Sequence, residues 1–182
     1  YYGYSNDPDE KNLLKITKNL GKSGIDSHKS VACNFKHQLI EDNHQIVIDP
    51  EKVEKSERLE LLRKLNELTR NHGSSICQVK ANIAEKKRKV LIANSEGLWT
   101  EDSRFYSRMG LSTVAEKYDG PQTASDNPGV LGGYEFFKDI DLAKLAESTA
   151  QTAIRMATAG YIDGGKMPDI LGNGFGGVIF HE

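Results

Sequence analysis

The stretch 74–117, SSICQVKANIAEKKRKVLIANSEGLWTEDSRFYSRMGLSTVAEK, carries the pattern that decides the fold. Its apolar residues occur in short runs separated by polar residues, which is typical of consecutive β-strands. The segment 94–97, Asn-Ser-Glu-Gly, is rich in turn-forming residues and lies between two of these runs. Short strands joined by short turns predict an antiparallel β meander that packs one face on helices.

Two further segments in and beyond this stretch are interpreted as connections. Four consecutive basic residues at 86–89, KKRK, lie between two apolar runs. We interpret them as a solvated hairpin turn, because a turn accommodates adjacent charges more simply than a phosphate site would. The segment 120–133 contains two clusters of Asp, Asn, Gly and Pro, and these predict a loop that leads to the last helix.

Helical patterns surround the predicted strands. The first covers about residues 8–20, with Asp7 as its N-cap. The second begins after Ser56, and the third begins after Asp141 and ends at Gly160. Helices packed on a meander of strands predict an α+β fold. The leucines expected to place the second helix in the core are Leu59, Leu62, Leu65 and Leu68.

The chain has 182 residues, enough for one domain or for one domain and part of a second. We expect 1–165 to form an N-terminal α+β domain, including a β-like region at about 26–48. The segment 166–182 is expected to start a metal-binding helix that is cut short. Both ends of the sequence look cut, because it does not begin with Met and it finishes on an apolar run.

The composition indicates a soluble globular protein. Hydrophobic residues make up 37% of the chain, charged residues 27%, and the net charge is -2. This balance gives no reason to expect a nucleic-acid or membrane surface, and there is no apolar run of membrane-spanning length. The two cysteines, Cys33 and Cys77, suggest neither a disulfide framework nor a metal clip. A reduced, cytoplasmic setting is therefore expected.

The segment with the clearest chemical potential is 174–182, GFGGVIFHE. Glycines allow tight turns and close backbone approach, and an apolar run then leads to His181-Glu182. A neutral imidazole can bind Zn²⁺, and an adjacent glutamate can act as general base on a metal-bound water. On spacing alone, a partly exposed pair at a chain end is the simpler explanation.

A second group of metal-ligating residue types lies in the predicted β-like region. With the strand period, Cys33 and His37 would share one face. A metal site there is an alternative to the C-terminal one, but ordinary surface histidines explain the pattern more simply. The residues concerned are His28, Cys33, His37 and His44.

The segment 174–182 resembles the start of the TldD/PmbA signature, a glycine-rich lead into His-Glu-x-x-x-His. The resemblance extends from about residue 46 to the end of the chain. In the signature the two histidines are five residues apart, about 140° around a regular helix, so binding one ion needs a distorted helix. Further segments similar to the family are Ile48–Pro50 before the leucine-rich helix, Asn94–Gly97, Arg104–Ala115 and Gly132–Glu135.

The resemblance implies the N-terminal part of a cytoplasmic zinc metallopeptidase that cleaves peptides or unfolded proteins. By the match, His181 would be the first zinc ligand and Glu182 the general base. The remaining family ligands match no position here, so this fragment alone is expected to be inactive. The family also implies a dimer, with an identical or a related partner subunit.

The alternative within the same family is a PmbA/TldE-like binding subunit without a working metal site. A third interpretation, a regulator of DNA gyrase that acts on DNA topology, is disfavoured by the negative net charge.

Overall fold

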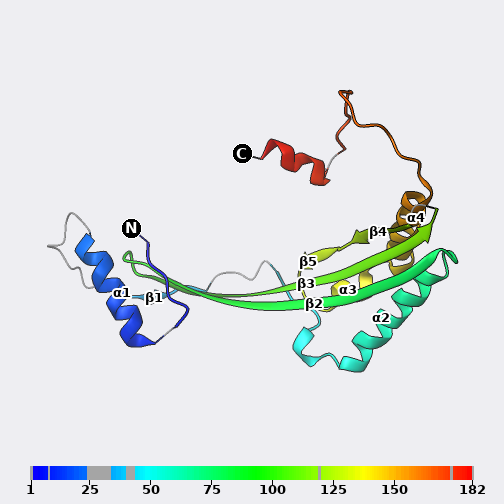
Figure 1. Cartoon of the computed structure of the whole chain (residues 1–182). Coiled ribbons are helices and arrows are strands. Elements are labelled where there is room, and N and C mark those ends of the chain that lie inside the picture. The colour runs from blue at the N-terminus through cyan, green and yellow to red at the C-terminus, as the bar shows by residue number, and fades with distance from the viewer. Residues whose placement is uncertain are drawn as a thin grey trace. The chain divides into compact units, whose positions relative to one another are not determined.

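The computed structural model describes residues 2–7, 9–23, 34–39, 44–118, 120–172 and 174–181. They divide into two compact units, one from Tyr1–Asn43 with Arg88–Arg104, and a second from His44–Lys87 with Phe105–Glu182. The elements in chain order are α1 (Glu10–Ser23), β1 (Lys36–His37), η1 (Pro50–Lys52), α2 (Lys55–Arg70), β2 (Ile76–Ala93), β3 (Leu98–Lys117), β4 (Gly120–Asp126), β5 (Gly129–Leu131), α3 (Glu135–Asp139), α4 (Leu142–Thr158) and η2 (Gly174–Phe180) (Figure 1).

Strand β3 is the centre of the sheet. It pairs with β2 along one side, antiparallel with β4 and β5, and parallel with β1. The predicted turn between β2 and β3 is confirmed at Asn94–Gly97, where Gly97 has a φ of 93° that suits a residue without Cβ. The sheet packed with helices confirms the predicted α+β fold, and the parallel pairing of β1 makes the sheet mixed.

The turn predicted at 86–89 is wrong, because β2 runs without interruption from Ile76 to Ala93. A strand can carry four adjacent cations when solvent reaches them. Lys86, Arg88 and Lys89 are exposed. Lys87 forms an ion pair with Glu51, and its ammonium lies 4.8 Å from the centre of the Phe105 ring. The run of basic residues is therefore not a sign of a turn at this position.

The loop predicted at 120–133 is also wrong, since β4 and β5 occupy most of it. Pro121 pairs with Glu116 near the start of β4, and β4 is an edge strand. Proline is tolerated at such a position because its missing N–H is not needed by a further strand. Gly120 supplies the positive φ, 88°, with which the chain turns back from β3.

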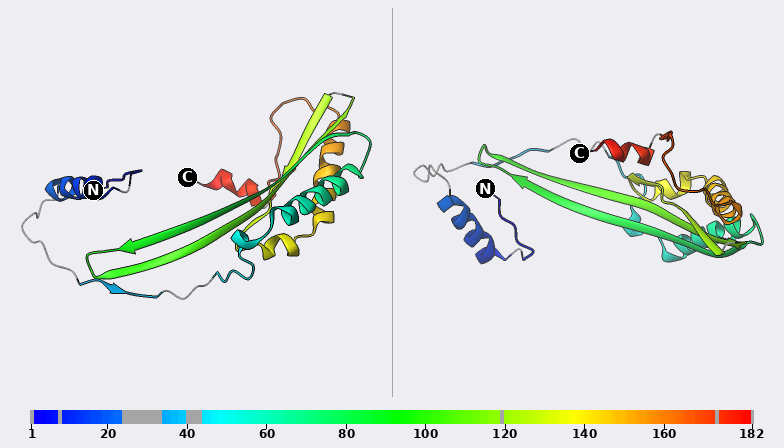
Figure 2. Two further views of the ribbon diagram at one scale, coloured as in Figure 1. Left: turned by 90° about the horizontal axis from the view of Figure 1, so that it is seen from below. Right: turned by 45° about the horizontal axis from the view of Figure 1, so that its top comes forward.

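The core of the second unit lies between the sheet and helices α2, α3 and α4, which cover one face of it (Figure 2). Small side chains at the end of α4 let that helix approach β3 and β4 closely. Ala153 and Ala157 pack on Ala115 and Ala124 there. The main cluster consists of Leu65, Met109, Leu111, Tyr134, Phe137, Leu142, Leu145 and Ala146. No helix in the described part of the chain is long and apolar enough to cross a membrane.

The predicted helix starts are correct in part. The Asp141 carboxylate accepts a hydrogen bond from Lys144 N at 2.9 Å and caps α4 as expected. Ser56 does not cap α2, because the helix already includes Lys55 and follows Glu54, whose side chain makes no capping bond. Helix α1 begins at Glu10, and Asp7 accepts from the Asp9 N–H just before it.

The first unit contains α1, β1 and the distal parts of β2 and β3. Of the β-like region predicted at 26–48, the described residues contain one strand, β1, whose neighbour Gln38 N donates to Trp99 O at 2.9 Å. Residues 24–33 and 40–43 lie outside the described residues. The predicted domain boundary between 165 and 166 stays a prediction, and α4 ends before it at Thr158.

Candidate metal-binding segment

The segment predicted to start the metal helix forms a 3-10 helix, η2, over Gly174–Phe180. His181 follows it directly, and its backbone N–H donates to Val178 O at 3.0 Å, which extends the same three-residue pattern. The His181 side chain is exposed, and Phe180 beside it is 81% exposed. The imidazole is therefore accessible to a ligand.

The described residues supply one ligand position and not a complete site. Glu182 lies outside them, so its predicted role as general base is not placed in the structure. No group of three or more His, Cys, Asp or Glu side chains in the described ranges could hold a metal ion. A catalytic zinc needs three protein ligands. His181 and Glu182 both remain predictions.

The alternative metal site in the N-terminal region is not assembled by the described residues either. His28 and Cys33 lie outside them. The His37 ring packs edge-on against Trp99, with 5.7 Å between the ring centres. His44 is described and exposed. Cys77, the free cysteine that is described, lies on β2, where its thiol donates to Val114 O at 3.4 Å.

Glu135 ties the segment before η1 to the start of α3. Its carboxylate accepts hydrogen bonds from Ile48 N and Gly133 N, each at 2.8 Å. Tyr134 N completes the contact by donating to Ile48 O at 2.9 Å. Burial by itself would raise the pKa of Glu135, but these backbone N–H donors outweigh it and lower the pKa below its ordinary value. The charged carboxylate therefore stabilises the fold.

We expect Glu135→Gln to destabilise the protein by about 1–2 kcal/mol at pH 7, because an amide offers one acceptor oxygen in place of two charged ones. Since the folded pKa is lowered, the carboxylate stabilises the fold above its unfolded pKa of roughly 4.3 and loses this effect as pH falls through the folded value. Urea unfolding from pH 7 to pH 3 should thus show the gap between the two proteins closing. A constant gap would contradict this role. Glu147→Gln, at an exposed carboxylate on α4, is the control.

Arg58 is the centre of a second long-range network. Its guanidinium forms an ion pair with Glu85 at 2.9 Å and donates to Val53 O at 2.5 Å and Pro50 O at 2.6 Å. It also lies 5.4 Å from the centre of the Tyr134 ring. The other Glu85 oxygen, Oε1, is buried without a hydrogen-bond partner.

This environment keeps the Tyr134 hydroxyl protonated. Burial, followed by the negative charge of Glu57, raises the pKa of Tyr134, and Arg58 only partly opposes them. The Tyr134 side chain itself is buried in the main core cluster. No local spacing identifies this network in the sequence, because Arg58 and Glu85 are 27 residues apart.

The comparisons with known proteins agree on one family. Residues 48–157 match the family model described as the PmbA/TldA metallopeptidase central domain. The chain is 22% identical over 175 residues to a metalloprotease TldD homolog from Buchnera aphidicola, and 28% identical over 137 residues to another from Haemophilus influenzae. These matches cover 92% and 72% of this chain, but only 34% and 28% of the two relatives. The chain thus spans about a third of the length of the curated relatives it matches.

Solved structures share the fold. The crystal structure of a Thermotoga maritima protein, described as a modulator of a DNA gyrase, superposes on this chain with a TM-score of 0.62. The sequence identity is 18%, and the match covers 86% of this chain. The crystal structure of TldE from Thermococcus kodakarensis gives a TM-score of 0.51 at 16% identity and covers 81%. This chain covers 34% and 33% of those two proteins. At sequence identities of 18% and 16%, the similarity shows a shared fold and nothing more.

Proposed function

Because this chain belongs to the PmbA/TldA metallopeptidase family, we propose that it is part of a TldD-like zinc metallopeptidase that cleaves peptides or unfolded proteins. The observation that carries the proposal is the position of His181-Glu182, directly after the glycine-rich segment of a chain whose central part matches the family. The exposure of His181 is consistent with a ligand role.

In this proposal His181 binds the zinc ion and Glu182 is the general base. The described residues fit one ligand position only, so two further protein ligands come from other parts of the intact protein. Zinc, when bound, supplies a Lewis acid that promotes hydrolysis. The apolar residues Val178, Ile179 and Phe180 are exposed in η2 and would pack against those other parts in the intact protein.

The test is the zinc content of the intact protein, with His181→Ala beside it. We expect about one zinc per subunit in the wild type, since a zinc site takes a single ion, and a large loss in the variant. His44→Ala, at another exposed histidine, is the matched control and should keep its zinc. Equal zinc content in the wild type and His181→Ala would exclude His181 as a ligand.

The second candidate is a non-catalytic subunit of the TldE type, which the fold match to the Thermococcus kodakarensis protein supports. The residue five positions after His181 in the gene product separates the two candidates, because the longer zinc motif needs a histidine there. Both candidates include a dimer with an identical or related partner, in the cytoplasm. Absence of zinc from the wild-type protein would favour the second candidate.

A further inference from the structure

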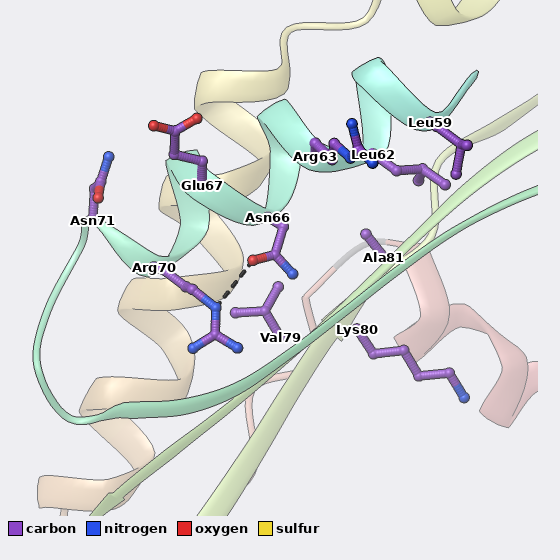
Figure 3. Close-up of a pocket in the computed structure, with 10 residues that line it drawn as sticks. All are labelled: Leu59, Leu62, Arg63, Asn66, Glu67, Arg70, Asn71, Val79, Lys80 and Ala81. Carbon is purple, nitrogen blue, oxygen red and sulfur yellow. Dashed lines mark hydrogen bonds between the residues drawn. The ribbon is translucent and has the colours of Figure 1, made fainter. Parts of the chain in front are cut away.

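A groove of about 630 Å³ lies between helix α2 and strand β2 in the second unit (Figure 3). We call it the α2–β2 groove. Leu59 and Leu62 of the helix face Val79 and Ala81 of the strand and form an apolar floor. Leu59 is 43% exposed, so the chain itself leaves part of this floor uncovered. The other lining residues are Arg63, Asn66, Glu67, Arg70, Asn71 and Lys80.

One side of the groove is a strand edge. Strand β2 pairs with β3, and in the described part of the chain no strand pairs with its other side. Every second N–H and C=O group along such an edge points outward and can bond an added strand. The α2–β2 groove therefore combines an apolar floor with a row of backbone donors and acceptors, the combination that binds extended peptides.

The rim of the groove is cationic. Arg63 and Arg70 lie about two turns apart on α2. Lys80 projects from the opposite side of β2 (Figure 3). Among the described residues, none of these three cations forms an ion pair. The carboxylate of Glu67 points away from the strand in the same view. Arg70 Nε donates to Asn66 Oδ1 at 3.0 Å, which holds its guanidinium beside Val79.

We propose that the α2–β2 groove binds an extended acidic peptide segment as an added strand on β2. Its backbone bonds the edge of β2, one set of alternate side chains lies over the apolar floor between Arg63 and Arg70, and the other set faces Lys80. A carboxylate in either set of side chains therefore lies near a cation. The site is separate from His181 and needs neither metal nor cleavage, so it stands independently of the proposed peptidase.

Charge disfavours a second copy of this chain as the occupant. Pairing two β2 edges would bring one basic strand beside another, and like charges across paired strands are destabilising. An acidic segment gains from the same charges. The charged residues of β2 are Lys80, Glu85, Lys86, Lys87, Arg88 and Lys89.

The experiment measures binding of a fluorescent peptide of about ten residues with alternating Glu and Val to the intact protein, by anisotropy. A chelator is present so that cleavage does not contribute. We expect the acidic peptide to bind at least about tenfold more tightly than the same peptide with Lys in place of Glu, and binding to weaken with added salt. Peptides N-methylated at alternate residues should bind weakly, because they cannot bond the strand edge.

The decisive variant is Arg63→Glu with Arg70→Glu, which should weaken binding of the acidic peptide at least about tenfold. Lys55→Glu with Lys64→Glu changes the net charge of α2 equally but lies outside the groove, and it should leave binding unchanged. All four side chains are exposed, so both double variants should fold, which circular dichroism checks. Equal effects of the two double variants, or equal binding of the Glu and Lys peptides, would overturn the proposal.

Discussion

Gly133→Ala is expected to lower the free energy of unfolding by about 3 kcal/mol. A Cβ at this position would lie 2.6 Å from Ile48 O and 2.6 Å from Ile46 Cγ2. Ile48 O is the atom that accepts from Tyr134 N, so moving it to relieve the clash breaks that hydrogen bond. The variant should also displace the Glu135 carboxylate, whose Oε2 would be 2.7 Å from the new Cβ.

The neighbouring Gly132→Ala is the matched control. Its Cβ would approach Val130 Cγ1 at 3.3 Å, the end of a side chain that can shift slightly. Its effect on stability should be below about 1 kcal/mol. Chemical denaturation of both variants measures the difference, and equal losses would show that the close approach at Gly133 does not limit stability.

Arg58→Met is expected to destabilise the protein by about 3 kcal/mol. The substitution keeps an unbranched side chain over Tyr134 but removes the donors to Glu85 and to the carbonyls of Val53 and Pro50. The Glu85 side chain is only 20% exposed, so it would be left as a charge without its partner. Urea unfolding at pH 7 measures the loss.

A double variant separates the ion pair from the rest of the network. Arg58→Met with Glu85→Met removes both charges, and we expect it to recover part of the stability lost in Arg58→Met. Lys138→Met is the control, because its ion pair with Glu57 is about half exposed on both sides and should contribute less than about 1 kcal/mol. A double variant less stable than Arg58→Met would contradict the account of an unpartnered carboxylate.

Local patterns in the sequence predicted the three longer helices and the main turn well, but they did not predict the short helix α3. The leucine spacing placed α2 to within a few residues, Asp141 marked the start of α4, and Asn94–Gly97 marked the hairpin. These features depend on neighbours within a few positions, so periodicity and capping preferences describe them. The α+β class followed from their order along the chain.

Features that depend on contacts between distant residues could not be predicted from local sequence patterns. The basic run at 86–89 was interpreted as a turn because nothing nearby indicates that Glu51 and Phe105 neutralise or cover Lys87. The segment 120–133 has loop-forming residues, but its pairing with β3 makes it a pair of strands. The Glu135 contact and the α2–β2 groove are likewise products of tertiary structure.

The candidate site likewise has a part that the sequence predicted and a part that it did not. His181 and Glu182 were identified from a short motif, and the structure adds the exposure of His181 and the 3-10 conformation before it. Partners for a zinc site cannot be inferred from spacing when they lie far away in the chain. The groove and its two arginines could be recognised only from the fold. The strand pairing shows that β2 pairs with β3 on one side and is an edge strand on the other.

The bond between Ile48 and Glu135 has a consequence for how the protein is made. The two residues are 87 positions apart, and Ile48 leaves the ribosome first. At typical rates of synthesis, about 5–20 residues per second, it waits roughly 4 to 17 s for its partner. Within this interval the ribosome makes α2 and then β3, but α4 follows only after Glu135, so the leucines of α2 lack part of their cover. A nascent chain that ends before α4 therefore exposes apolar side chains that the finished fold buries, and a chaperone would protect them.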